Sequence, residues 1–225
     1  MKTIIVGLAV IATATVIPAT NVQADTADVG LRQTIEAPVS KLSFQDRSGN
    51  DIAAPRLNFP LRTARYVCQK DATAPSTVLG TDAQKLFASI PDRSASGWDI
   101  SIAPTNGVEN GWHGSSNNVM RISDGTNEGC GEGPDSASKG GLLSVDTSDM
   151  QVSDACDWGC ADPIFMRRGP STDYAHTPSV SLYASATPHV GWEGTLSNIR
   201  LRQTIPAGQA ADDYVLPLTV TLTEL

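Results

Sequence analysis

The segment DYVLPLTVTLT, residues 213–223, carries the clearest strand pattern of the chain. Apolar side chains alternate with threonines along it, which is the two-residue period of a strand with one buried face. Pro217 falls on the outward parity and cannot donate a ladder hydrogen bond, so we place this strand at a sheet edge or next to a bulge.

Shorter runs of the same kind fill the rest of the chain. Residues 97–103 alternate Trp98, Ile100 and Ile102 with polar residues, again with one face buried. Asp, Gly, Pro, Ser and Thr, which favour turns over helices, separate the runs. We therefore predict an all-β chain built as an antiparallel β-sandwich. The weaker strand candidates are 29–35, 39–44, 62–68, 84–90, 118–122, 141–145, 178–184 and 194–205.

The first 24 residues have the form of a secretory signal. Lys2 precedes an apolar run over residues 4–17, and Val22-Gln23-Ala24 fits a small-x-small cleavage site. The run is too short to span a bilayer, and no later segment is long and apolar enough to do so. We expect a secreted protein of the cell surface or cell wall with a single mature domain, residues 25–225. Without a sorting tail after Leu225, retention at the surface is expected to be noncovalent.

The four cysteines, Cys68, Cys130, Cys156 and Cys160, suit disulfides in an exported protein and allow three pairings. We expect Cys68 to pair with Cys130 and Cys156 with Cys160. A zinc site is disfavoured because Cys68 and Cys130 stand alone in the sequence.

Residues 123–162 carry most of the net negative charge, with nine acidic residues and one lysine. This stretch is rich in Gly and Ser and holds three of the cysteines, so we interpret it as a long acidic excursion fixed to the sandwich by a disulfide. A solvated acidic loop is the simpler interpretation. Calcium is the alternative ligand, at residues 124–128 or 146–149, whose carboxylate and carbonyl oxygens suit a hard cation.

Sequence motifs for catalysis are missing. His113, His176 and His189 occur in unrelated contexts, without an HExxH motif, and no G-x-S-x-G motif is present. We predict no catalytic residues, no metal ligands and no bound cofactor. A secreted hydrolase acting on polysaccharide or peptide is the alternative, with Asp146 and Asp149 as its carboxylates.

The tryptophans offer candidate ligand contacts. Trp98 shares the buried parity of its strand, so we assign it to the core. Trp112 and Trp158 lie in turn-rich sequence, where an exposed aromatic ring stacks on a sugar or fills a pocket of a partner. Both are candidates for ligand contact, with packing against their own loops as the alternative.

Two segments resemble the WxL domain of secreted surface proteins of Gram-positive bacteria. Residues 86–102 resemble its first signature, with Trp98 after Gly97 and Ile100 in the place of leucine. Residues 199–222 resemble its closing strands, with an IPAG turn at 205–208, a tyrosine at 214 and a TVTL ending in which Val220 replaces tryptophan. The resemblance implies a β-sandwich held noncovalently on the cell wall, often acting in adhesion with other surface proteins.

We therefore expect a noncatalytic cell-surface or cell-wall-associated protein whose partners are a wall polymer or other surface proteins. The formal net charge of −8 and the lack of a basic patch exclude nucleic acid as a partner. A self-assembling surface-layer or fibre subunit is a further alternative. Its pairing edges would be the edge strand around Pro217 and the strand over residues 29–35. The LRQTI sequence at 31–35 recurs at 201–205.

Overall fold

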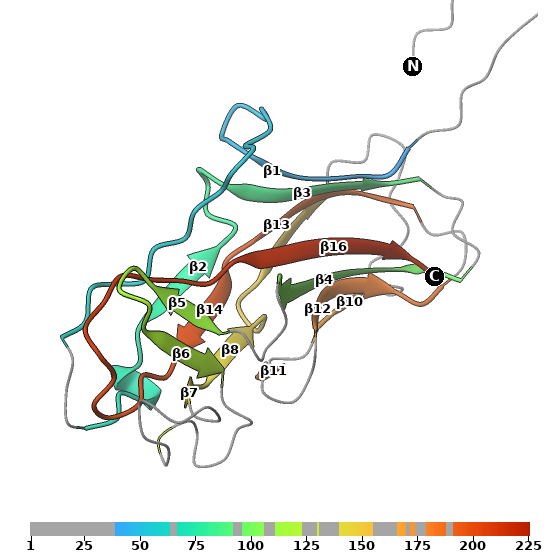
Figure 1. The fold of residues 1–225 in the computed structure, drawn as a ribbon. Helices are drawn as coiled ribbons and strands as arrows, with labels where there is room; N and C mark the ends of the chain where they lie inside the picture. Colours follow the sequence, from blue (N-terminus) through green and yellow to red (C-terminus); the bar gives the residue numbers. More distant parts are fainter. Residues whose placement is uncertain are drawn as a thin grey trace, which may run out of the picture. The chain divides into compact units, whose positions relative to one another are not determined.

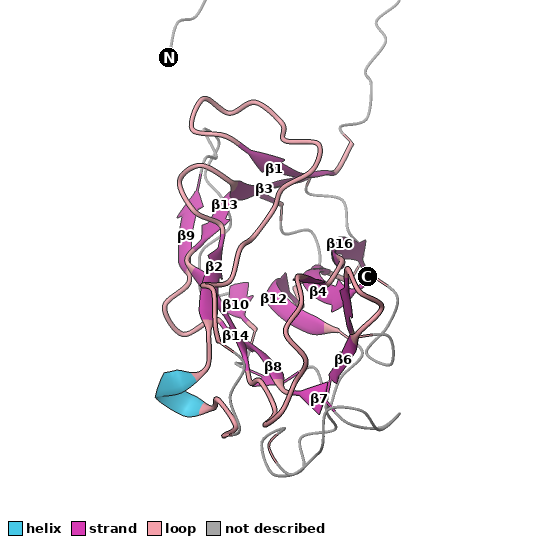
Figure 2. Ribbon diagram, turned by 60° about the vertical axis from the view of Figure 1, so that its left-hand side comes forward, coloured by secondary structure: helices cyan, strands magenta, loops and turns pink. Residues whose placement is uncertain are grey.

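A computed structural model describes residues 39–63, 67–91, 96–105, 111–122, 130, 140–154, 166–169, 172–173, 179–187 and 191–225. They all belong to one compact unit, Pro38–Leu225. Within these ranges the chain is built of strands, and its one helical element is the 3-10 turn η1 at Asp71–Thr73 (Figures 1 and 2). The all-β prediction is confirmed.

The strands form four sheets of four strands each, and every pairing is antiparallel except that of β6 with β7. The first sheet has the order β1 (Lys41–Gln45), β3 (Lys85–Ile90), β13 (Trp192–Ser197) and β9 (Gln151–Asp154). The second has the order β10 (Met166–Arg168), β12 (Val180–Ser185), β4 (Trp98–Pro104) and β16 (Leu218–Glu224). The third has the order β11 (Thr172–Asp173), β8 (Leu143–Asp146), β14 (Ile199–Gln203) and β2 (Ser76–Leu79). The fourth has the order β15 (Tyr214–Val215), β5 (Trp112–Gly114), β6 (Val119–Ile122) and β7 (Gly140–Gly141).

The first and third sheets are two halves of one bent sheet. Three lengths of chain run through both halves in the same side-by-side order, as β2 into β3, β13 into β14 and β8 into β9. The bend falls at Asn198, whose φ of 60° breaks the β13–β14 strand. The N–H of Asn198 donates to the carbonyl of Gly80 at 3.1 Å, and its Nδ2 donates to the carbonyl of Asp149 at 2.8 Å. These two bonds tie the three breaks together, because Gly80 follows β2 and Asp149 follows β8.

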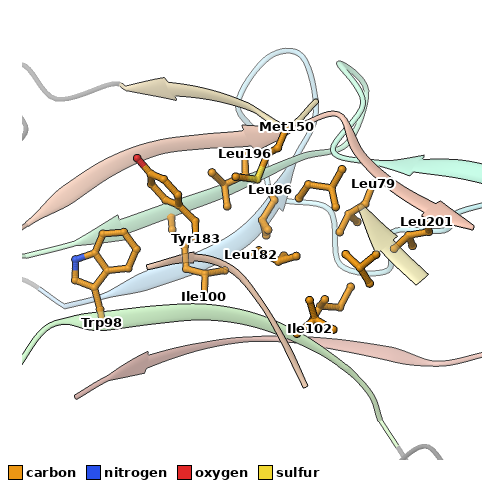
Figure 3. Close-up of a cluster of buried hydrophobic side chains, with 14 of the residues drawn as sticks. Leu79, Leu86, Trp98, Ile100, Ile102, Met150, Leu182, Tyr183, Leu196 and Leu201 are labelled. Carbon is orange, nitrogen blue, oxygen red and sulfur yellow. The ribbon is translucent and has the colours of Figure 1, made fainter. Parts of the chain in front are cut away.

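The second sheet faces the first across a sandwich-like core (Figure 3). Trp98 of β4 stacks on Trp192 of β13, and Tyr183 of β12 packs against both rings. Strands β3, β4 and β13 alternate buried and partly exposed side chains, as the period-two patterns require. The largest fully buried side chains are Leu86, Trp98, Ile100, Ile102, Leu143, Met150, Leu182, Trp192, Leu196, Ile199 and Leu201.

Most of the expected strands form, with differences that have physical reasons. The strand predicted over 213–223 divides into β15 and β16 around Pro217. Among the described strands, β16 pairs only with β4, so it lies at the end of its sheet. The strand predicted over 194–205 divides at Asn198. The strand predicted over 62–68 is wrong for its described residues, which form no ladder. Residues 29–35 lie outside the described part of the chain.

The acidic stretch 123–162 contributes to the sheets where it is described. Residues 140–154 form β7, β8 and β9, and Leu143, Val145 and Met150 are buried in the core. The remainder of the stretch, apart from Cys130, lies outside the described residues, as does the predicted signal over residues 1–24. Among the helices of the described ranges, none is long and apolar enough to cross a membrane.

Candidate binding site

An open pocket of about 910 Å³ lies where four parts of the chain meet. Its walls come from the segment 56–63, from β5 and β6, from the end of β14, and from the loop 209–215. Burial alternates along the first of these, with Leu57 and Phe59 packed against the core while Arg56 and Asn58 are exposed. The pocket is therefore backed by the core and open to solvent on its other side.

Trp112 forms an aromatic wall of this pocket. It occupies the start of β5 and pairs with Met120 of β6. Its Nε1–H donates to Oε1 of Gln203 at 2.7 Å, and Phe59 meets the indole edge to face at a centroid distance of 5.5 Å. Gln203 is only 3% exposed, and its Nε2 donates to the carbonyl of Thr204 at 2.7 Å. The indole orientation is therefore fixed by a buried amide that is itself fixed.

Gln209 brings a buried polar side chain to the same pocket. Its backbone N–H donates to the carbonyl of Pro206, so the predicted IPAG turn at 205–208 sets its position. Its side chain is held by Tyr214: Nε2 donates to the tyrosine hydroxyl at 2.6 Å, and this hydroxyl donates to the carbonyl of Ala210 at 2.9 Å. The single proton of the tyrosine hydroxyl is donated to the Ala210 carbonyl, so its oxygen accepts the hydrogen bond from Nε2 of Gln209. Oε1 of Gln209 takes no part in these two bonds.

A carboxylate network lies at the rim. Asp212 accepts hydrogen bonds from the Ser115 hydroxyl at 2.5 Å, the Ser116 backbone N–H at 2.9 Å and Nδ2 of Asn118 at 2.9 Å. These bonds favour the ionised form, and they hold the pKa of the Asp212 carboxyl well below its ordinary value of 3.8. Asp212 therefore fastens the 209–215 loop to the β5–β6 turn, and both line or border the pocket.

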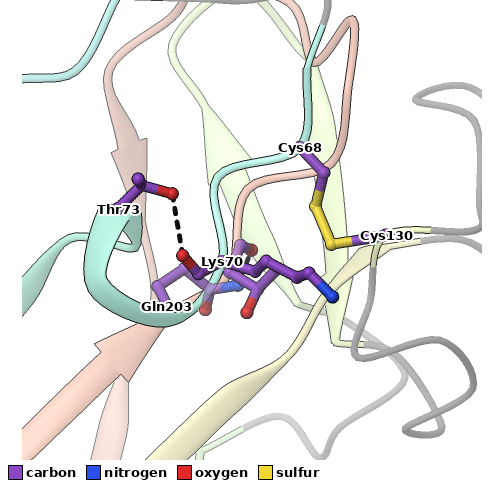
Figure 4. The surroundings of a disulfide bond; sticks show 6 residues. Cys68, Lys70, Thr73, Cys130 and Gln203 are labelled. Atoms are coloured by element: carbon purple, nitrogen blue, oxygen red, sulfur yellow. Dashed lines mark hydrogen bonds between the residues drawn. A yellow bond between two sulfur atoms is a disulfide. The ribbon is translucent and has the colours of Figure 1, made fainter.

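A disulfide joins Cys68 to Cys130, the longer-range pairing expected from the sequence (Figure 4). The neighbouring Gln69 makes two backbone hydrogen bonds with Ile205, at 2.9 and 3.1 Å. Both Gln69 and Ile205 line the pocket. The disulfide thus anchors Cys130 beside one wall of the pocket.

The other candidate residues fall outside this site. Trp98 is fully buried in the core, as predicted, at 0% exposure. Asp146 and Asp149 do not line the pocket; both contact Arg200, at 3.9 and 3.0 Å. Within the described ranges, no group of three His, Cys, Asp or Glu side chains is arranged to hold a metal ion. Trp158, Cys156, Cys160 and residues 124–128 lie outside the described residues.

Comparisons with other proteins do not place the chain in a family. No family model matches it, and neither the curated proteins nor the solved structures include a significant match.

Proposed function

We propose that this chain is an exported, noncatalytic cell-surface protein that binds a cell-wall polymer or another surface protein through the pocket at Trp112. The observation that carries the proposal is the pocket itself. It is concave, it is backed by the core, and it combines aromatic surface with a few positioned polar groups, which is the usual make-up of a ligand site.

The sequence supports the same location and role. The charged, apolar and small-residue regions of residues 1–24 follow the order of an export signal. The resemblance to the WxL domain implies noncovalent association with the wall. Rigid strands that carry a site on their loops are a common way of presenting a binding surface.

Sedimentation with isolated Gram-positive cell walls tests the proposal. The purified mature chain, residues 25–225, is mixed with walls at moderate salt, and its partition between pellet and supernatant is measured. Retention in the pellet is expected. A protein that stays in the supernatant, and that cells release freely into the medium, would count against wall binding.

One observation favours a second candidate function, that of a self-assembling surface subunit. Strand β16 is seven residues long, pairs only with β4 among the described strands, and has no Lys, Arg or Pro within it. Edges of this kind accept strands from other chains. Molar mass measured across a concentration series tests this function: growth with concentration supports it, and a constant monomer mass contradicts it.

A further inference from the structure

We infer that two copies of this chain pair through β16, with the two strands antiparallel and centred on Thr221. The inference rests on the second proposed function, self-assembly, because it names the partner, the edge and the register of that assembly. A contact between identical edges about a two-fold axis closes at a dimer, so a larger layer needs a second contact elsewhere on the molecule.

The main-chain groups of β16 alternate between β4 and the outer edge, which is the side of β16 that faces away from β4. At one end of the ladder, the N–H of Thr105 donates to the carbonyl of Pro217 at 2.9 Å. At the other end, the N–H of Leu225 donates to the carbonyl of Gly97 at 2.8 Å. The register between these ends is continuous, so the odd-numbered residues of β16 bond to β4. The N–H and C=O groups of the even-numbered residues therefore point to the outer edge, and these residues are Leu218, Val220, Leu222 and Glu224.

This outer edge is self-complementary in one register. When Thr221 lies opposite the partner's Thr221, Val220 lies opposite the partner's Leu222. Leu218 then lies opposite the partner's Glu224. Both members of each even-numbered pair direct their main-chain groups at one another, so the four pairs exchange about eight hydrogen bonds. A shift of two residues in either direction loses one of these pairs, and a shift of one residue sets outward-pointing groups against groups that are bonded to β4.

Strand β16 lacks the features by which sheet edges avoid pairing. The other end strands of the two facing sheets are shorter and charged. Strand β1 has five residues and contains Lys41, β9 has four and ends at Asp154, and β10 has three and contains Arg167 and Arg168. Strand β16 has seven residues, and its single charged side chain is the last one, Glu224. Long edges without charge along them are the ones that accept another strand.

The inner side chains of β16 leave apolar surface for a neighbouring strand to cover. Leu218, Val220 and Leu222 pack against the core but remain partly exposed. On the adjacent β4, which has a strand on each side, Ile100 and Ile102 are 0% and 1% exposed. A second β16 therefore buries apolar surface in addition to forming hydrogen bonds.

Charge favours the antiparallel direction. In a parallel pair the two Glu224 carboxylates lie side by side, and like charges directly opposite one another are destabilising. In the antiparallel pair they are six residues apart along the strands, or about 20 Å, which is well beyond the screening length of about 8 Å at physiological salt. On the exposed face, Thr221 meets the partner's Thr221 and Thr219 meets the partner's Thr223, and such threonine pairs stabilise antiparallel strands.

Disulfide cross-linking of the mature chain tests the register. Single cysteines are placed on the exposed face of β16, and mild oxidation with copper phenanthroline is followed by nonreducing electrophoresis, with the parent chain as background. Thr221→Cys is expected to form a covalent dimer, because two such positions face each other within the reach of a disulfide. Thr219→Cys and Thr223→Cys are the matched controls: each lies about 14 Å from its counterpart in the partner, so each alone should lose the cross-link. A mixture of these two variants should regain it.

Charge substitution tests the same contact without a cross-link. Thr221→Lys and Thr221→Glu each set like charges opposite one another, so dimer affinity measured by sedimentation velocity should fall about two- to fivefold. A mixture of the two variants should dimerise more tightly than either variant alone. Thr81→Lys is the control, because it adds the same charge at an exposed residue of the turn between β2 and β3, outside the second sheet. Circular dichroism verifies that each variant is folded.

Two results would overturn the inference: cross-linking that is equal for the three single cysteines, or a dimer affinity that Thr221→Lys leaves unchanged. If molar mass still grew with concentration, self-assembly would stand and pairing through β16 would be rejected. A constant monomer mass would reject both, and wall binding through the pocket would remain as the proposed function.

Discussion

Trp98 in β4 stacks on Trp192 in β13, with ring centroids 5.8 Å apart and planes inclined by 20°. The two strands belong to different sheets, so this contact joins the faces of the sandwich-like core. Tyr183 lies 5.7 Å from the first ring and 5.1 Å from the second. Burial in this cluster raises the pKa of the Tyr183 hydroxyl to about 12, because ionisation there lacks solvent.

Truncation of this contact should destabilise the fold. Trp192→Ala is expected to lower the free energy of unfolding by about 3–5 kcal/mol, since the cavity lies between two sheets. Trp192→Phe keeps an aromatic ring but loses the Nε1 hydrogen bond to Asp154 at 2.7 Å, so its effect should be smaller. Urea unfolding followed by circular dichroism measures both. A loss below about 1 kcal/mol for Trp192→Ala would contradict the role of this stack.

The bend between the first and third sheets depends on Gly80. Its φ is +77°, and an added Cβ would lie 2.7 Å from the carbonyl oxygen of Leu196. Gly49 is the matched control, with a φ of +82° and open space around it. Gly49→Ala should cost about 1–2 kcal/mol through backbone strain. Gly80→Ala should cost about 1–3 kcal/mol more, because the new methyl group meets backbone. Thermal unfolding of the two variants side by side measures the difference, and equal losses would show that the bend tolerates a side chain.

Loss of the Cys68–Cys130 disulfide should destabilise the protein mainly through the unfolded state. The residues are 62 apart, and closing a loop of this length is worth about 4 kcal/mol in the chain-entropy account. The variant Cys68→Ser/Cys130→Ser, unfolded in urea beside the oxidised protein, measures this difference. The two backbone hydrogen bonds between Gln69 and Ile205 are expected to open more often as well, and hydrogen exchange of these two amides would detect this. A double variant as stable as the parent would contradict a stabilising role for this disulfide.

Asp212 should contribute stability in a pH-dependent manner. Its folded-state pKa lies below its ordinary value of 3.8, so the stabilisation is complete above that value and is lost as the pH falls through the lower, folded-state pKa. Asp212→Asn should therefore reduce stability at neutral pH, and the difference from the parent should shrink only in strong acid. Thermal unfolding from pH 7 down to pH 2 measures this course. A difference that disappears already at pH 5 would indicate another titrating group.

A strand could be predicted from the sequence where apolar and polar residues alternate within a single short segment. The pattern of β4 and of β16 lies within seven residues each, and burial of one face accounts for it. The bend at Asn198 was not predictable, because its cause is contact with Gly80 and Asp149, which are distant in sequence. The strand expected at 62–68 does not form in its described residues, of which Arg62 and Thr63 line the pocket instead of pairing in a sheet.

Of the residues that line the candidate site, the sequence pointed to Trp112 alone. Trp112 stood out because a large aromatic residue in turn-rich sequence needs either a partner or a ligand. Phe59 and Gln209 were missed, since neither carries a local pattern and their roles arise from chain segments that meet only in the fold. The IPAG turn at 205–208 was the nearest signal, because it places Gln209.

Amide chemical-shift mapping shows directly whether the pocket at Trp112 binds cell-wall material. The isotope-labelled mature protein is titrated with solubilised fragments of Gram-positive cell wall. Saturable shifts are expected to gather at the segments that line the pocket, residues 56–63, 112–115 and 209–215. An absence of shifts, or shifts gathered along β16 with the pocket unchanged, would rule out binding at this pocket.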